Sequence, residues 1–324
     1  MKSSVGSRST TILKWFGSLL SVGLIIYLLV QQGWQEIGQA LAQIPLWGFA
    51  VSVLLMIVSR FAVSNRWYAL LRATDEDVNW AQSVRLTFAG LFATNFLPTT
   101  IGGDIVRLGG AVQYGMDGAV ITASLVVDRL VGMFGMALML PLGIIPMIAW
   151  MRSAQQSALS PLVWSLTLVQ DSLWKKIWRK ITQIAKKIFE ALKYWWGHPR
   201  SLIESLAFTG IHMLCFFGII WILFLGLDDP VPFGMVAGLY SFVYLVTLLP
   251  ISINGYGLQE LSISLIFSEV AGASLQHSLM VALIFRTLTM LASLPGAAFV
   301  PGIMVGQKRS RSLGEETAPL EADD

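Results

Sequence analysis

The chain has 324 residues, of which 55% are hydrophobic and 13% are charged, and its formal net charge is +3. Soluble domains carry about 25% charged residues, so this composition excludes an ordinary soluble protein and indicates a polytopic membrane protein with a single helical domain. One cysteine (Cys215) and three scattered histidines exclude a disulfide framework and a cysteine- or histidine-based metal site. The positive charge is concentrated in a few connections, which argues for an effect on membrane orientation and against nucleic-acid binding.

The N-terminal region predicts two membrane spans. Basic residues precede an apolar run over 12–30, which we interpret as an uncleaved first span. The connection 31–45 has no Lys or Arg, and a second span from Leu46 to about Val63 is followed by Arg66 and Arg72. This distribution predicts a cytoplasmic N-terminus. Tryptophans near the predicted ends suit the membrane interface: Trp34, Trp47, Trp67 and Trp80.

The middle of the chain contains a short apolar segment, a long one and a basic helix. The short segment covers 82–97, and the long run over 118–150 is interrupted by charges and two prolines. After another short run (157–170), apolar residues over 171–196 recur at helical spacing opposite seven Lys and Arg. That pattern predicts an amphipathic helix lying on the anionic cytoplasmic leaflet.

The C-terminal half predicts further spans at 202–225, 233–249 and 278–300, with a short helical piece at 258–270. The basic residues after the last span place the C-terminus in the cytoplasm as well, and the acidic tail 311–324 is typical of disorder. We therefore expect an all-α integral membrane protein with six to eight transmembrane helices in one domain, residues 1–310. A plasma-membrane location is expected.

Two stretches share one unusual design. Both read Leu-Pro-x-x-Ile-(Gly/Asn)-Gly, beginning at Leu97 and at Leu249, and each ends on a charge, Arg107 and Glu260. In each, a proline stops an apolar helix and glycines loosen the backbone that follows. Irregular backbone within a membrane persists only where it is buried in protein or lines a cavity. We predict two broken or re-entrant elements.

The two stretches also predict an internal repeat with halves at about 82–150 and 233–300. Downstream of each lies an arginine in an apolar run (Arg129, Arg286), and each run is predicted to break at a proline (Pro141, Pro295). Paired interrupted segments of this kind point to a transporter-like binding site between pseudo-symmetric halves. The alternative is that both are ordinary surface loops and that their likeness is accidental.

The broken elements and the charges beside them supply the candidate site. Charges within a membrane usually face a partner or a cavity, although those at the start of a span can be interfacial, and Arg60 and Arg85 are assigned to snorkelling. The candidate substrate-binding residues are Asn95, Pro98, Gly102, Gly103, Asp104, Arg107, Asp128, Arg129, Pro250, Asn254, Gly255, Gly257, Glu260 and Arg286. We expect Arg107 to hold a lipid phosphate, and Glu260 either to pair with Arg286 or to contact a cationic head group.

These motifs, in this order, resemble the transmembrane region of lysylphosphatidylglycerol synthase, a flippase-like family, over about residues 10–305. Asp128 stands where many relatives have Glu. The resemblance implies the lipid-translocating region without the aminoacyltransferase domain that bifunctional members carry. It does not imply lysylphosphatidylglycerol as the substrate.

Three functional classes remain open from the sequence. A flippase-like transporter would bind an anionic or lipid-linked molecule and move it across the membrane. A membrane-embedded transferase would use Asp104, Asp128 or Glu260 as a base or a metal ligand. A non-catalytic scaffold subunit would use the basic helix. The transporter is preferred, with membrane lipids as partners, no nucleic acid, no cofactor and no metal. A homo-oligomer is left open.

Overall fold

The computed structural model describes residues 44–96, 102–155, 195, 197–248 and 255–303. Within these ranges the regular structure is helical, and four helices are long and apolar enough to cross a membrane. The predicted all-α membrane protein is confirmed. The first span 12–30, the run 157–170, the amphipathic helix 171–196 apart from Trp195, and the acidic tail lie outside the described residues. The total number of crossings therefore stays a prediction.

Two long antiparallel helices form the centre of the fold. These are α3 (Leu46–Leu71) and α8 (Pro199–Gly226). At one end Gly226 lies against Pro45, and at the other Ser201 Oγ donates a hydrogen bond to the Ala69 carbonyl. The pair therefore runs side by side over its whole length.

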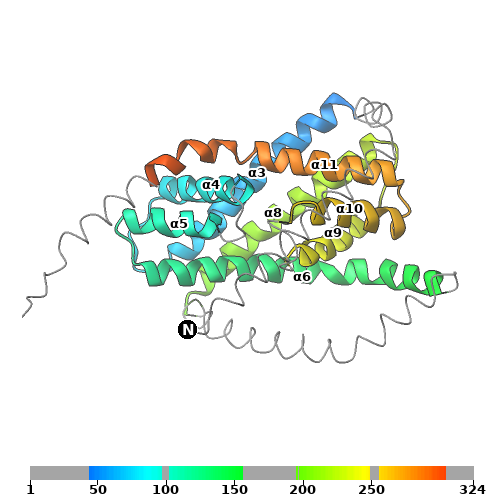
Figure 1. Cartoon of the computed structure of the whole chain (residues 1–324). Coiled ribbons are helices and arrows are strands. Elements are labelled where there is room, and N and C mark those ends of the chain that lie inside the picture. The colour runs from blue at the N-terminus through cyan, green and yellow to red at the C-terminus, as the bar shows by residue number, and fades with distance from the viewer. Residues whose placement is uncertain (1–43, 97–101, 156–194, 196, 249–254, 304–324) are drawn as a thin grey trace, which may run out of the picture.

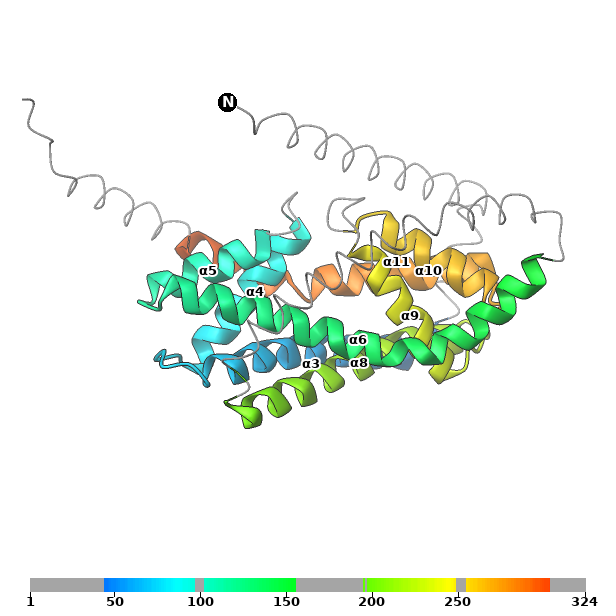
Figure 2. The same cartoon turned by 90° about the horizontal axis from the view of Figure 1, so that it is seen from below.

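The remaining helices form two similar series, and Figure 2 shows both on the same side of this pair (Figures 1 and 2). The first series is α4 (Trp80–Phe96), α5 (Gly102–Gln113) and α6 (Gly118–Gln155). The second is α9 (Phe233–Thr247), α10 (Leu258–Glu269) and α11 (Leu275–Leu291), followed by the 3-10 helix η1 (Leu294–Ala298). The observed helices α4 and α10 match the predicted segments 82–97 and 258–270 closely.

The last helical element of each series packs on the other series. α6 packs on α9 of the other series, and η1, which continues α11, packs on α4 (Figure 1). Contacts within the series also correspond, because α4–α5 and α5–α6 have counterparts in α9–α10 and α10–α11. The helix contacts among α3–α6 therefore have counterparts at the matching positions among α8–α11.

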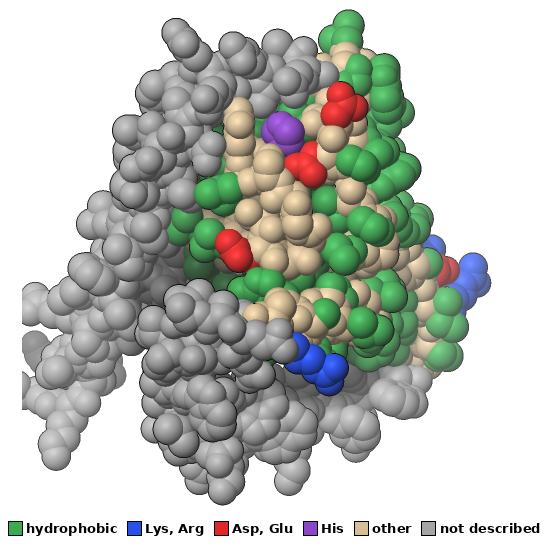
Figure 3. All heavy atoms as spheres, turned by 90° about the vertical axis from the view of Figure 1, so that its right-hand side faces the viewer, with side chains coloured by type: hydrophobic (Ala, Val, Ile, Leu, Met, Phe, Trp, Pro, Cys, Tyr) green, Lys and Arg blue, Asp and Glu red, His purple; other side chains and the backbone are tan. Residues whose placement is uncertain are grey.

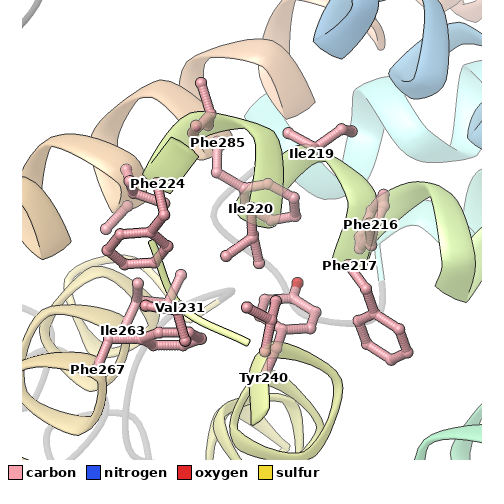
Figure 4. Packing of buried hydrophobic residues seen from close by; sticks show 14 of the residues in the cluster. Phe216, Phe217, Ile219, Ile220, Phe224, Val231, Tyr240, Ile263, Phe267 and Phe285 are labelled. Carbon is pink, nitrogen blue, oxygen red and sulfur yellow. The ribbon is translucent and has the colours of Figure 1, made fainter. Parts of the chain in front are cut away.

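Aromatic rings on α8 form the largest part of the core. Figure 4 shows Phe216, Phe217 and Phe224 of α8 facing side chains of α9, α10 and α11. The Phe216 ring meets that of Phe285 edge to face at 5.0 Å, and the Phe224 ring stacks on that of Phe267 at 5.2 Å. Because lipid tails are as apolar as these side chains, close packing of this kind is what holds membrane helices together.

Glycines allow α6 and α9 to touch through their backbones. A Cβ on Gly238 would lie 2.0 Å from the Gly143 nitrogen, and one on Gly143 would lie 2.6 Å from the Gly238 carbonyl carbon. No side chain fits at this crossing, which is the small-residue contact typical of membrane helices.

Replacing Gly238 by alanine is therefore expected to force α6 and α9 apart and to cost about 1–3 kcal/mol of stability, the range for overpacking. Gly210→Ala is the matched control, because a Cβ on that helical glycine meets nothing within 4 Å. Thermal unfolding in detergent measures both. An unchanged midpoint for Gly238→Ala would contradict this account of the crossing.

Two sequence expectations about helix boundaries are wrong. α6 runs unbroken through Pro141 and Pro146, whereas a break at Pro141 was expected. Proline removes one backbone hydrogen bond, but a membrane helix tolerates this loss because neighbouring helices can satisfy the freed backbone group. α3 extends past Val63 to Leu71, so Arg66 lies inside the helix. The expected interruption at Pro295 is confirmed, since α11 ends at Leu291 and η1 follows.

Candidate functional site

A buried carboxylate, Asp128 of α6, joins three helices. Its side chain is 1% exposed and accepts from two guanidinium groups, Arg66 Nε at 2.7 Å and Arg107 Nη1 at 3.1 Å. Arg66 belongs to α3 and Arg107 to α5. A buried charge is tolerated when it is paired and hydrogen-bonded, and Asp128 meets both conditions.

Asp104 extends this network toward the surface. Its Oδ2 lies 2.5 Å from Arg129 Nε, and its Oδ1 lies 3.7 Å from Arg107 Nη1. The Arg129 side chain is 52% exposed, whereas that of Arg107 is 9% exposed. We call Arg66, Asp104, Arg107, Asp128 and Arg129 the first charge cluster. With three guanidinium groups and two carboxylates, it carries one surplus positive charge.

The position of Arg107 is set by an aromatic ring and by two glycines. Its guanidinium carbon lies 4.1 Å from the centre of the Trp67 ring, a cation–π contact. A Cβ on Gly90 would lie 2.7 Å from Arg107 Cγ, and one on Gly103 would lie 2.5 Å from the Gly90 carbonyl oxygen. Gly103 therefore serves the close packing of α4 on α5. Gly102 is also buried and begins α5.

The second broken element forms a second charge cluster, Glu260 with Arg286. Arg286 Nε donates to Glu260 Oε1, and Arg286 Nη2 donates to the Gly255 carbonyl at 3.2 Å. Gly255 and Gly257 have φ of 70° and 76°, a region that favours glycine. Of the two expectations for Glu260, pairing with Arg286 is the one found.

The two broken elements meet. Tyr256 Oη donates a hydrogen bond to the Asn95 carbonyl at the end of α4, and the Tyr256 ring centre lies 4.8 Å from the Arg286 guanidinium. Asn95 Nδ2 in turn donates to Ser293 Oγ at 3.0 Å. Three candidate residues, Pro98, Pro250 and Asn254, lie outside the described residues.

Several buried polar atoms in these clusters, and one of Arg60 outside them, have no hydrogen-bond partner within the described part of the chain. They include Arg107 Nε and Nη2, Glu260 Oε2 and Arg60 Nε. A buried donor or acceptor left unpaired costs about 1–3 kcal/mol, and more when the group is charged. These atoms therefore mark places where a polar ligand atom or water would be stabilised.

The family model described as the lysylphosphatidylglycerol synthase TM region matches residues 14–296. The chain belongs to this family. It is accordingly a membrane protein of a lipid-handling family, as the resemblance implied. No curated protein matches the chain. Both charge clusters lie inside the matched region.

The structure buries Arg66 and two nearby residues of α3 that the sequence did not predict to be buried. Arg66 was expected in a connection, Trp67 at the membrane interface and Arg60 in a snorkelling position. All three are buried, with Trp67 at 0% exposure. A signal was present, because Ser52, Ser59 and Arg66 recur every seven residues and form one polar stripe that continues beyond Val63.

Proposed function

We propose that the protein binds lipids that carry an anionic phosphate and moves them across the bilayer. One observation supports this above all: among the described residues, the membrane part contains more guanidinium groups than carboxylates. The five arginines are Arg60, Arg66, Arg107, Arg129 and Arg286, and the three acids are Asp104, Asp128 and Glu260. Charges at this depth usually need partners, and a bound anion would neutralise the surplus.

Guanidinium groups suit a phosphate because their donors match its oxygens in pairs. Arg107 is the proposed contact, since its Nε and Nη2 are the donors that its carboxylate partners leave unused. A second part of the proposal is that α3–α6 and α8–α11 are two repeats of one unit. It is supported by the packing of the last helical element of each series on the other series. Motion of one repeat against the other is a common basis of transport.

The test is a reconstitution. The purified protein is reconstituted in vesicles that contain a fluorescent phosphatidylglycerol. In these vesicles the inner-leaflet probe is expected to become accessible to an added quencher. In protein-free vesicles the inner-leaflet probe is expected to stay protected. A water-soluble dye trapped inside the vesicles controls for leakage, because the quencher reaches it only if the membrane is permeable. If the vesicles with and without protein behave alike, the proposal is wrong.

We also propose that both termini are cytoplasmic and that the membrane is the plasma membrane. The end formed by the α3–α4 connection and the start of α8 exposes Arg72, Arg85 and Arg200. The opposite end, viewed in Figure 3, exposes Asp228 and Glu269 and carries the Asp229–His277 pair (Nδ1 to Oδ2, 3.0 Å), with Arg152 at the end of α6. Among the described residues, more Lys and Arg lie at the first end than at the opposite end, which favours a cytoplasmic position for the first end.

This orientation predicts a labelling pattern. A cysteine at Glu269 is expected to react with a membrane-impermeant maleimide in intact cells, and one at Arg200 only after permeabilisation. The native Cys215 is buried and provides the background control. The reverse pattern would show that the orientation is inverted.

A further inference from the structure

An apolar groove of about 560 Å³ opens between α3, α4 and the α11–η1 turn. Its walls are apolar side chains, among them Val53, Ile57, Phe61, Phe88 and Leu291. Among the described residues that line it, Arg60 is the only charged one. The groove contains no member of either charge cluster.

Arg60 differs from the other buried arginines because no carboxylate within the described ranges pairs with it. It is 4% exposed. Its Nη2 donates to the Thr289 carbonyl at 3.3 Å, and its guanidinium carbon lies 5.6 Å from the centre of the Phe216 ring. Its Nε is buried without a hydrogen-bond partner. A neutral carbonyl and a ring leave most of its charge uncompensated.

Arg60 also lies far from either membrane surface. It is the fifteenth of the 26 residues of α3. At about 1.5 Å per residue it lies about 21 Å along a helix about 39 Å long. Snorkelling to an interface from this depth is out of reach.

We propose that this groove binds one phosphate-bearing lipid, with an acyl chain along the apolar walls and the phosphate against Arg60. Charge complementarity selects the anion, and the apolar walls select a lipid over a free phosphate ion. The Thr289 carbonyl that Arg60 contacts also accepts from Asn95 Nδ2 at 3.5 Å. The groove therefore ends beside the contact between the two broken elements. This inference concerns binding and holds whether or not the lipid is translocated.

The experiment uses the full chain in detergent micelles with two photoreactive probes. One is a phosphatidic acid with a diazirine near the end of an acyl chain, and the other is the diacylglycerol with the same chains. Phosphatidic acid is expected to label peptides of α3 and α11. Arg60→Gln is expected to lower this labelling by about tenfold, as for loss of one charged donor, while diacylglycerol labelling changes little. Arg60→Lys is expected to retain part of it.

Matched variants separate the charge from the groove. Arg200→Gln also removes one positive charge, but its side chain is 92% exposed, so labelling is expected to stay at the parent level. Ile57→Trp fills the groove and is expected to lower labelling by both probes. Ile145→Trp places the same bulk on α6, at a position 76% exposed and outside the groove, and is expected to have no effect.

Equal phosphatidic acid labelling of the parent and Arg60→Gln would overturn the inference, as would an equal loss of labelling by both probes in Arg60→Gln. If Ile57→Trp leaves labelling unchanged, the lipid does not bind in the groove and the inference is wrong. This variant remains a test of the groove if Arg60→Gln fails to fold. A protein that shows the expected labelling but moves no lipid would keep this inference and refute the proposed function.

Discussion

Arg107→Ala is expected to abolish translocation of an anionic lipid by the reconstituted protein while leaving the protein folded and inserted. Translocation is lost because the Nε and Nη2 donors proposed to hold the phosphate are removed. Folding is retained because both acids of the first charge cluster keep a partner. Asp128 remains 2.7 Å from Arg66, and Asp104 remains 2.5 Å from Arg129.

Arg107→Lys is expected to restore translocation only in part, since an ammonium group cannot reproduce the two-pronged contact of a guanidinium with phosphate. The measurement is the initial rate of probe exposure in vesicles, with thermal unfolding of each variant beside it. Transport by Arg107→Ala at the parent rate would remove Arg107 from the site. Loss of transport together with unfolding would assign Arg107 a structural role in the cluster.

Asp128→Asn is expected to be among the most destabilising single substitutions in the membrane part. Asparagine keeps the shape of the side chain but removes the charge that Arg66 and Arg107 share. Removing one partner from a buried ion pair costs about 3–5 kcal/mol because the other charge is left uncompensated. We expect a large fall in the thermal unfolding midpoint.

Asp104→Asn is the matched control for this substitution. The Asp104 side chain is 22% exposed and its partner Arg129 is half exposed, so water compensates for much of the lost charge and the expected effect is small. If Asp104→Asn and Asp128→Asn lower the midpoint equally, burial of the Arg66–Asp128–Arg107 triad is not what stabilises the first charge cluster.

Local signals in the sequence predicted the helices around the broken elements. Leu-Pro followed by glycines correctly indicated that α4 and α9 end, and a short helix was predicted after the second element only, so α5 was not predicted. The residues of the first charge cluster other than Arg66 were also identified, since Asp104, Arg107, Asp128 and Arg129 interrupt apolar runs. Composition and proline chemistry act within a few residues, which is the range that a single sequence reveals.

Partners distant in the sequence could not be predicted. Arg66 contacts Asp128, 62 positions away, and a hydropathy pattern treats any arginine after an apolar run as the end of the span. The contact between the Trp67 ring and the Arg107 guanidinium could not be predicted for the same reason, because the two residues are distant in the sequence. The pairing of Glu260 with Arg286 was only one of two options, because choosing between them needs the packing of α10 on α11.

The two prolines inside α6 have a mechanical consequence. Each lacks an N–H group, so the carbonyl groups of Ala137 and Leu142 receive no hydrogen bond from the residue four positions on. Bending α6 at these points breaks fewer backbone bonds than bending it elsewhere, which makes this segment a compliant hinge. The hinge point at Pro141 separates Asp128 and Arg129 from the Gly143 contact with α9, whereas Pro146 lies beyond that contact. A swing of α9 would thus be accommodated within α6 itself, and the ion pairs of the first cluster would not have to open.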